Sequence, residues 1–297
     1  MNDSQVYAPR LERRIARHSL RGVDHAVSEW GDADAPLVVY LHGWGDCAAT
    51  FQFVVDAFEH DWHVVAPDFR GFGDSVADVA SYWFPDYIAD LAALLDKLSP
   101  DEPVRFIGHS MGANVAGLYA GSFPERIRAF ANVEGFGLRD ADPGDAPGRY
   151  RQWIEAANAA PGFATYASFD ELAAKINRRN PAMDTDKAAF VARCWARSGD
   201  GQVVLRADPK HKLPNPVLYR RAESEACWRN VDAPVLLVAG AQSPFADAVD
   251  ERLGTGSLGL PFPNAETAVI EAAGHMMHFE APGALAATLE RFLRRFL

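Results

Sequence analysis

Gly108-His109-Ser110-Met111-Gly112 sets a serine between two glycines in a G-x-S-x-G pattern. The apolar run from Val104 to Ile107 before it predicts a buried strand, and the stretch from Ala113 to Ala120 after it predicts a helix. A sharp strand–turn–helix junction exposes the serine hydroxyl, and the glycines leave room for the strained backbone around it. The pattern therefore predicts that Ser110 is a nucleophile.

A serine hydroxyl needs a general base to take its proton, and the base needs an acid to orient it. His275 follows Gly274 and the apolar run from Ala268 to Ile270, so it lies on a loop at the end of a predicted strand. His278 is the alternative base, but the place of His275 directly after the strand end favours His275. His109 adjoins the serine, and we expect it to point away from the reactive side.

Backbone N–H groups aimed at a developing negative charge are the second requirement of this chemistry. Met111 follows the predicted nucleophile at the start of a helix and supplies one such group. The apolar run from Leu37 to Leu41 leads into His42-Gly43-Trp44-Gly45-Asp46, where glycines allow close backbone approach. The sequence therefore predicts an oxyanion hole formed by the N–H groups of Trp44 and Met111.

The elements that must position these residues are apolar runs of strand length that alternate with helical patterns. Continuous apolar strands are typical of a mostly parallel sheet covered on both faces. A more polar, alternating stretch from Val23 to Glu29 predicts antiparallel strands at one edge. We therefore predict an α/β fold whose core comprises residues 1–138 and 232–297.

The strand rhythm stops between about Leu138 and Val231, and the intervening residues predict several helices without buried strands. A turn-rich linker from Asp140 to Gly148 opens this segment. Aromatic residues are frequent in it: Trp153, Phe163, Tyr166, Phe169, Phe190 and Trp195. Because ligands bind at the carboxyl ends of strands in open α/β sheets, we predict that residues 139–231 form a helical cap over that edge.

Composition excludes several classes of partner. The 297-residue chain has a formal net charge of −11, which argues against binding to nucleic acid or anionic membranes. No apolar run approaches the ~20 residues of a membrane span, and the N-terminus lacks the apolar core of a secretory signal. Three widely spaced cysteines give no disulfide framework. We therefore expect a cytoplasmic protein that acts on a small molecule.

Metal and cofactor motifs are absent from the sequence. His275 and His278 lie three residues apart without a third ligand nearby, which does not make a zinc site. The chain contains neither a G-x-x-x-x-G-K-[ST] phosphate loop nor a dinucleotide fingerprint. We therefore predict no cofactor and no metal.

Over nearly its full length the chain resembles the α/β-hydrolase superfamily, specifically its capped serine hydrolases. The resemblance rests on His42-Gly43-Trp44, on residues 68–75, on Gly108 to Gly112, and on Gly274-His275 before Phe279-Glu280-Ala281-Pro282. It implies an eight-stranded, mostly parallel sheet flanked by helices, with a helical cap. It also implies Ser110 as nucleophile and His275 as base, and it gives Asp68 and Arg70 structural roles in bracing a loop.

The triad acid is where the chain departs from its relatives. Many of them carry an aspartate after the penultimate strand, and the matching residue here is Ser243. Glu134 ends the predicted strand from Ala129 to Val133, at a strand end where some members of the superfamily carry their acid. Asp247 lies a few residues beyond Ser243. An acid between a buried strand and a Gly-x-Gly loop is seldom incidental, which favours Glu134 over Asp247.

The sequence thus predicts a serine hydrolase that cleaves carboxylic esters, with an apolar acyl or aryl group beneath the aromatic cap. Lactonase, thioesterase and carbon–carbon bond hydrolase activities use the same triad and stay open. Dehalogenases and epoxide hydrolases of this fold use aspartate as nucleophile, so Ser110 argues against both. A non-catalytic ligand-binding protein on the same fold is the alternative from another class.

Overall fold

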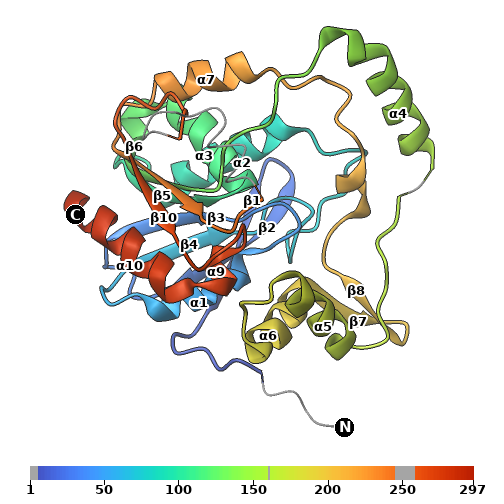
Figure 1. Cartoon of the computed structure of the whole chain (residues 1–297), viewed down its shortest axis with the longest axis horizontal. Coiled ribbons are helices and arrows are strands. Elements are labelled where there is room, and N and C mark those ends of the chain that lie inside the picture. The colour runs from blue at the N-terminus through green and yellow to red at the C-terminus, as the bar shows by residue number, and fades with distance from the viewer. Residues whose placement is uncertain (1–5, 160, 245–257) are drawn as a thin grey trace.

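An eight-stranded sheet forms the centre of the protein in a computed structural model, which describes residues 6–159, 161–244 and 258–297 (Figure 1). The strand order is β1-β2-β4-β3-β5-β6-β9-β10. The strands are β1 (Arg14–Leu20), β2 (Val23–Trp30), β3 (Leu37–Leu41), β4 (His63–Pro67), β5 (Val104–His109), β6 (Ile127–Val133), β9 (Val235–Gly240) and β10 (Ala265–Ile270). β2 pairs antiparallel with β1 and β4, and the other neighbours are parallel. The predicted α/β fold and its antiparallel edge are confirmed.

Helices cover both faces of this sheet. The described helices are α1 (Gln52–Ala57), α2 (Phe84–Leu98), α3 (Met111–Ser122), α4 (Ala146–Asn158), α5 (Phe169–Arg179), α6 (Thr185–Trp195), α7 (Arg221–Arg229), α9 (Met277–Glu280) and α10 (Pro282–Leu293). One apolar core joins the sheet to α1 and α10, and a second core joins its other face to α2, α3 and α7. The apolar stripe of α10 explains its placement, since Leu285, Leu289 and Phe292 are all buried.

The sequence predicts a buried apolar strand around Ala268 to Ile270, but β10 is less buried than this. It is the last strand in the described sheet and pairs with β9. Val269 is 49% exposed, and Glu266 is exposed as well. Because successive side chains of a strand alternate between its two faces, these residues lie on opposite faces, so both faces of the strand are partly exposed. A strand at the edge of the described sheet has a neighbour on one side alone, so its side chains are less covered than those of central strands, and a three-residue apolar run is too short to reveal this.

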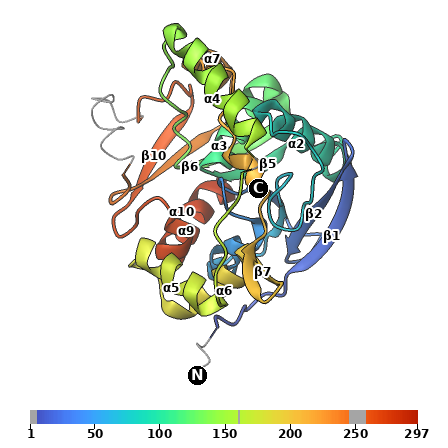
Figure 2. The ribbon, with the colours of Figure 1, turned by 90° about the vertical axis from the view of Figure 1, so that its right-hand side faces the viewer.

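Between β6 and β9 the chain leaves the sheet, and α5, α6 and a two-stranded ribbon lie beside it (Figures 1 and 2), whereas α7 packs in the core with α3. The ribbon pairs β7 (Ala196–Gly199) with β8 (Gln202–Leu205), which corrects the prediction of helices alone. Each strand has four residues and little burial, so apolar periodicity could not find it. The turn residues Asp200 and Gly201 both have positive φ, and Asp-Gly is the sequence signal of such a hairpin.

The cap segment and the core share an apolar cluster. Phe53 of α1 and Phe279 of α9 pack in it with Leu172 of α5 and Val191 of α6. The limits 139–231 for the cap stay a prediction. Within the described residues, no helix combines the length and the apolar character that crossing a membrane requires.

The topology brings the candidate site residues to one edge of the sheet. β3, β5, β6, β9 and β10 run parallel, so their carboxyl ends meet there. Each of these strands leads into a segment singled out by the sequence: His42 to Asp46, Ser110, Glu134, Ser243 and His275.

Candidate active site

Ser110 occupies a strained turn between β5 and α3. Its φ is 51° and its ψ is −114°, a backbone conformation that costs energy for any residue with a β-carbon. The N–H of Ser110 donates to the carbonyl oxygen of Val133 at 2.8 Å, which fixes the turn against β6. The side chain is half-buried. This geometry is that of a nucleophile elbow.

The two flanking glycines are required by space. A β-carbon on Gly108 would lie 2.5 Å from the Cα of Ala113, and one on Gly112 would lie 2.1 Å from the carbonyl oxygen of Leu41. Both clashes are with backbone, which cannot move aside cheaply. The G-x-S-x-G pattern is therefore a steric requirement of this turn.

Glu134 and His275 lie in contact. The Oε2 atom of Glu134 is 3.1 Å from Nδ1 of His275, and the carboxylate is fully buried. Glu134 also accepts from the backbone N–H of Gly240 at 2.7 Å and from the hydroxyl of Ser243 at 2.6 Å. A carboxylate at Nδ1 favours the tautomer with the proton on Nδ1, in which Nε2 is the basic nitrogen.

Ser243 thus has a place in the site that the sequence did not reveal. It stands where the resemblance leads one to expect an acid, and instead it donates to the acid that comes from β6. The sequence signal that could have revealed this role is the missing acid at position 243. A small hydrogen-bond donor at that position can bind a carboxylate that comes from the neighbouring strand. Asp247, the alternative acid, lies outside the described residues.

The loop after β3 approaches the serine closely. A β-carbon on Gly43 would lie 3.4 Å from the β-carbon of Ser110 and 2.8 Å from Nδ1 of His109. His42 holds this loop, because its Nδ1 donates to the carbonyl oxygen of Gly43 at 2.8 Å and its Nε2 accepts from the N–H of Phe69 at 2.9 Å.

The N–H groups predicted to form the oxyanion hole come from two different segments. Within the described part of the chain, the backbone N–H of neither Trp44 nor Met111 has a hydrogen-bond acceptor. Met111 opens α3, where the helix dipole adds partial positive charge. Both groups are therefore available to a ligand, and their role in an oxyanion hole stays a proposal.

Asp68 and Arg70 make the bracing contacts expected of them. Asp68 accepts from the backbone N–H groups of Ala48 at 2.7 Å and of Asp74 at 2.8 Å. Arg70 donates twice to the carboxylate of Asp90, both times at 2.6 Å. These bonds tie the loop after β4 to its neighbours.

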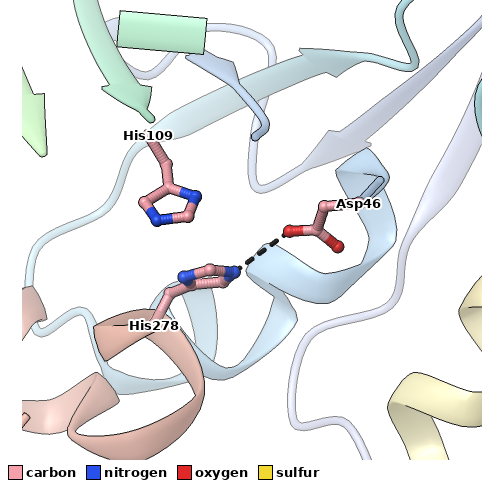
Figure 3. Close-up of side chains that lie close together, drawn as sticks. All are labelled: Asp46, His109 and His278. Carbon is pink, nitrogen blue, oxygen red and sulfur yellow. Dashed lines mark hydrogen bonds and ion pairs between the residues drawn. The ribbon is translucent and has the colours of Figure 1, made fainter. Parts of the chain in front are cut away.

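Two further histidines lie near His275: the ring centre of His109 is 4.8 Å from that of His275 and 4.5 Å from that of His278. Figure 3 shows His109 and His278 together with Asp46. Nε2 of His278 is 3.1 Å from Oδ2 of Asp46, and the pair is buried. His278, the alternative base, is therefore engaged by Asp46 while Glu134 engages His275. Nε2 of His109 donates to the backbone carbonyl oxygen of His275 at 2.8 Å, a contact that the sequence did not predict.

Asp46, His109 and His278 also form the group that comes nearest to a metal site in the described chain. One ligand-capable atom from each lies within 4.8 Å of the others. Asp46 additionally accepts from Nε1 of Trp195 at 2.7 Å and from the hydroxyl of Thr50 at 2.8 Å. These bonds already occupy its carboxylate, so we interpret the group as a network that joins the loop after β3, the segment around His275 and the predicted cap segment.

The charge of Asp46 matters to stability. Burial alone raises its pKa, but the hydrogen bond and the charge of His278, with help from His42 and Trp195, outweigh it and lower the pKa from 3.8 to about 2. A carboxyl whose pKa is lower in the folded state stabilises the fold above its unfolded pKa and loses that contribution as the pH falls through the folded value. Burial lowers the pKa of His109, which therefore stays neutral at pH 7.

Replacing Asp46 by asparagine should reduce the free energy of unfolding by about 2 kcal/mol near pH 7, since one pKa unit corresponds to about 1.4 kcal/mol. Urea unfolding of both proteins at a series of pH values measures this difference, which should shrink between about pH 4 and pH 2. Asp24→Asn is the matched control, because the Asp24 side chain is 64% exposed. A difference that does not change with pH would assign the loss to shape and not to charge.

A cavity of about 590 Å³ lies between the loop after β3 and the predicted cap segment. Trp44, Gly45 and Met276 line it from the core, and Phe163, Tyr166 and Trp195 line it from the cap. Three of the predicted cap aromatics therefore face a cavity. Trp153 is not among its described lining residues and lies on α4, a helix without buried residues.

Comparison with known proteins places these features in a family. The pattern of the alpha/beta hydrolase fold family matches residues 36–282. A serine hydrolase-like protein of Danio rerio is 25% identical over 273 residues, which is 89% of this chain and 83% of that protein. A 3-hydroxybutyrate-oligomer hydrolase of Cupriavidus necator is 27% identical over 280 residues, which is 88% of this chain and 90% of that protein.

A solved structure agrees with this assignment. The hypothetical protein PA1622 of Pseudomonas aeruginosa superposes with a TM-score of 0.84 at 28% identity, over 96% of this chain and 100% of that one. The chain belongs to the alpha/beta hydrolase fold family, and it is a hydrolase.

Proposed function

We propose that this protein hydrolyses carboxylic esters through an acyl-enzyme on Ser110. The observation that carries the proposal is the buried contact between Glu134 and Nδ1 of His275, at the sheet edge where β5 presents Ser110 on a strained turn. A nucleophilic serine, a histidine base and a buried acid that orients the histidine are the three members of a catalytic triad.

In the first half of the proposed reaction, Oγ of Ser110 attacks the ester carbonyl carbon while Nε2 of His275 takes its proton. The carbonyl π electrons move to oxygen, and the N–H groups of Trp44 and Met111 stabilise that charge. Glu134 stabilises the imidazolium. Collapse of the intermediate re-forms the carbonyl and breaks the bond to the alcohol oxygen, which takes the proton from His275.

In the second half, water attacks the acyl-enzyme with His275 as general base. The new tetrahedral intermediate uses the same two N–H groups. Its collapse releases the carboxylic acid and returns the proton to Oγ of Ser110. The relative named as a 3-hydroxybutyrate-oligomer hydrolase supports this reaction class, because an oligomer of a hydroxy acid is joined by carboxylic ester bonds.

The test combines activity with active-site labelling. We expect the protein to hydrolyse p-nitrophenyl esters and a fluorophosphonate to label Ser110 stoichiometrically, as mapped by peptide mass spectrometry. Comparing kcat/KM for lactones and thioesters with kcat/KM for the esters shows which of these substrate classes the protein prefers. A protein that neither labels nor turns over any of these compounds would be a binding protein on the hydrolase fold.

A further inference from the structure

The cavity between the loop after β3 and the predicted cap segment is lined mainly by positive charge, whereas the chain as a whole is negatively charged. Four basic side chains line it: Lys175, Arg179, Arg206 and Lys212. The chain as a whole carries a formal net charge of −11. Among the described lining residues Asp46 is the one acid, and His278, Trp195 and Thr50 already engage its carboxylate.

Most of this positive charge lacks a protein counter-ion. Arg206 pairs with Asp74. Within the described part of the chain, Lys175, Arg179 and Lys212 form no ion pair with a carboxylate. Three cations that face one cavity without carboxylate partners repel one another, and a bound anion would relieve that repulsion.

Aromatic rings hold two of these cations at the cavity wall. Nζ of Lys175 lies 5.1 Å from the ring centre of Tyr166, and Nζ of Lys212 lies 4.9 Å from that of Phe163. Both rings line the cavity too. Cation–π contacts position an ammonium group without neutralising its charge, so the lysines stay able to attract an anion.

The cavity also lies beside the proposed site of reaction, although Ser110 and His275 are not among its described lining residues. Trp44, whose N–H is proposed to bind the oxyanion, and Met276, which follows His275, line its inner side. Leu172 and Ile176 of α5 supply apolar surface on the cap side. Lys175 and Arg179 of the same helix line the cavity as well. The wall therefore offers apolar surface for a chain and positive charge for an end group.

We propose that this cavity binds the acyl part of an ester whose acyl chain ends in a carboxylate, that is, a half-ester of a dicarboxylic acid. The cleavage step rests on the proposed function, whereas binding of the anionic chain does not. The inference refines the apolar substrate expected from the sequence, because the apolar walls contact the middle of the chain and the cations contact its end.

The kinetic test compares mono-p-nitrophenyl esters of dicarboxylic acids, from succinate to suberate, with neutral p-nitrophenyl alkanoates of equal chain length. We expect kcat/KM to be about tenfold higher for the best anionic ester, since one well-placed charge contact contributes on the order of a tenfold change. The preference should fall as NaCl rises to about 0.5 M, because these side chains are partly exposed and salt screens them.

The variant Lys175→Met/Arg179→Met should lose most of that preference, because kcat/KM should fall more for the anionic esters than for the neutral ones. Arg178→Met is the matched control, since Arg178 lies on the same helix but is not a lining residue. An equal loss in the control, or no preference for anionic esters in the wild-type protein, would overturn the proposal while ester hydrolysis stands.

A binding measurement separates this proposal from the proposed function. Calorimetry on Ser110→Ala should detect monomethyl adipate and give a Kd at least about tenfold weaker for dimethyl adipate, its neutral analogue. Lys175→Met/Arg179→Met in that background should remove the difference. If no ester is hydrolysed but this difference is observed, the proposed function fails and the anion site stands. Equal binding of monomethyl adipate and dimethyl adipate would overturn the proposed anion site.

Discussion

Ser110→Ala should lower kcat for ester hydrolysis by about a million-fold, the typical cost of losing the nucleophile of a serine triad. Alanine keeps the β-carbon and the backbone strain of the serine at φ 51°, so the fold should be unaffected. Steady-state kinetics on the purified variant measure the loss, and thermal melting measures the fold. Fluorophosphonate labelling should disappear together with activity.

Ser243→Ala is a control for the loss of a hydroxyl near the triad. It removes the hydrogen bond to Glu134 and leaves nucleophile, base and acid in place. We expect a loss of roughly 10- to 150-fold, since one hydrogen bond to a charged group contributes about 1.5–3 kcal/mol. If Ser110→Ala retained activity within a hundredfold of wild type, Ser110 would not be the nucleophile.

The fold was predictable because its signals are local. Apolar runs such as Leu37–Leu41 and Val235–Ala239 are long enough to indicate buried strands. The G-x-S-x-G turn is recognisable because a β-carbon at either glycine would clash with backbone atoms. The β7–β8 ribbon was missed because four-residue strands carry no usable period. Its Asp200-Gly201 turn was the signal available.

Contacts between distant segments were harder to predict. Glu134 could be proposed from its place at a strand end, but its bonds to Gly240 and Ser243 depend on β6 and β9 being neighbours. The bond from His109 to the carbonyl of His275 joins residues 166 positions apart. The basic residues that line the cavity come from α5 and from the segment before α7. No pattern along the chain predicts that these two segments lie close together.

Glu134→Gln should lower kcat by about 10⁴-fold, by analogy with loss of the acid in serine proteases. Glutamine keeps the shape and can still accept from the N–H of Gly240 through its oxygen. Its amide group would then face Nδ1 of His275 as a donor. That contact favours a proton on Nε2, where the base must accept one from Ser110, and the imidazolium also loses its counter-charge.

A rescue variant tests whether Glu134 is the triad acid. Glu134→Gln/Ser243→Asp returns a carboxylate to the place where many relatives carry theirs, and Ser243 already lies within hydrogen-bond distance of the Glu134 carboxylate. We expect it to recover at least about a hundredfold of the lost kcat, measured with the same p-nitrophenyl ester. Asp247→Asn should change kcat less than about threefold. If Asp247→Asn instead caused the larger loss and Glu134→Gln a small one, the acid would come from the loop after β9, and Glu134 would be a structural partner of Gly240 and Ser243.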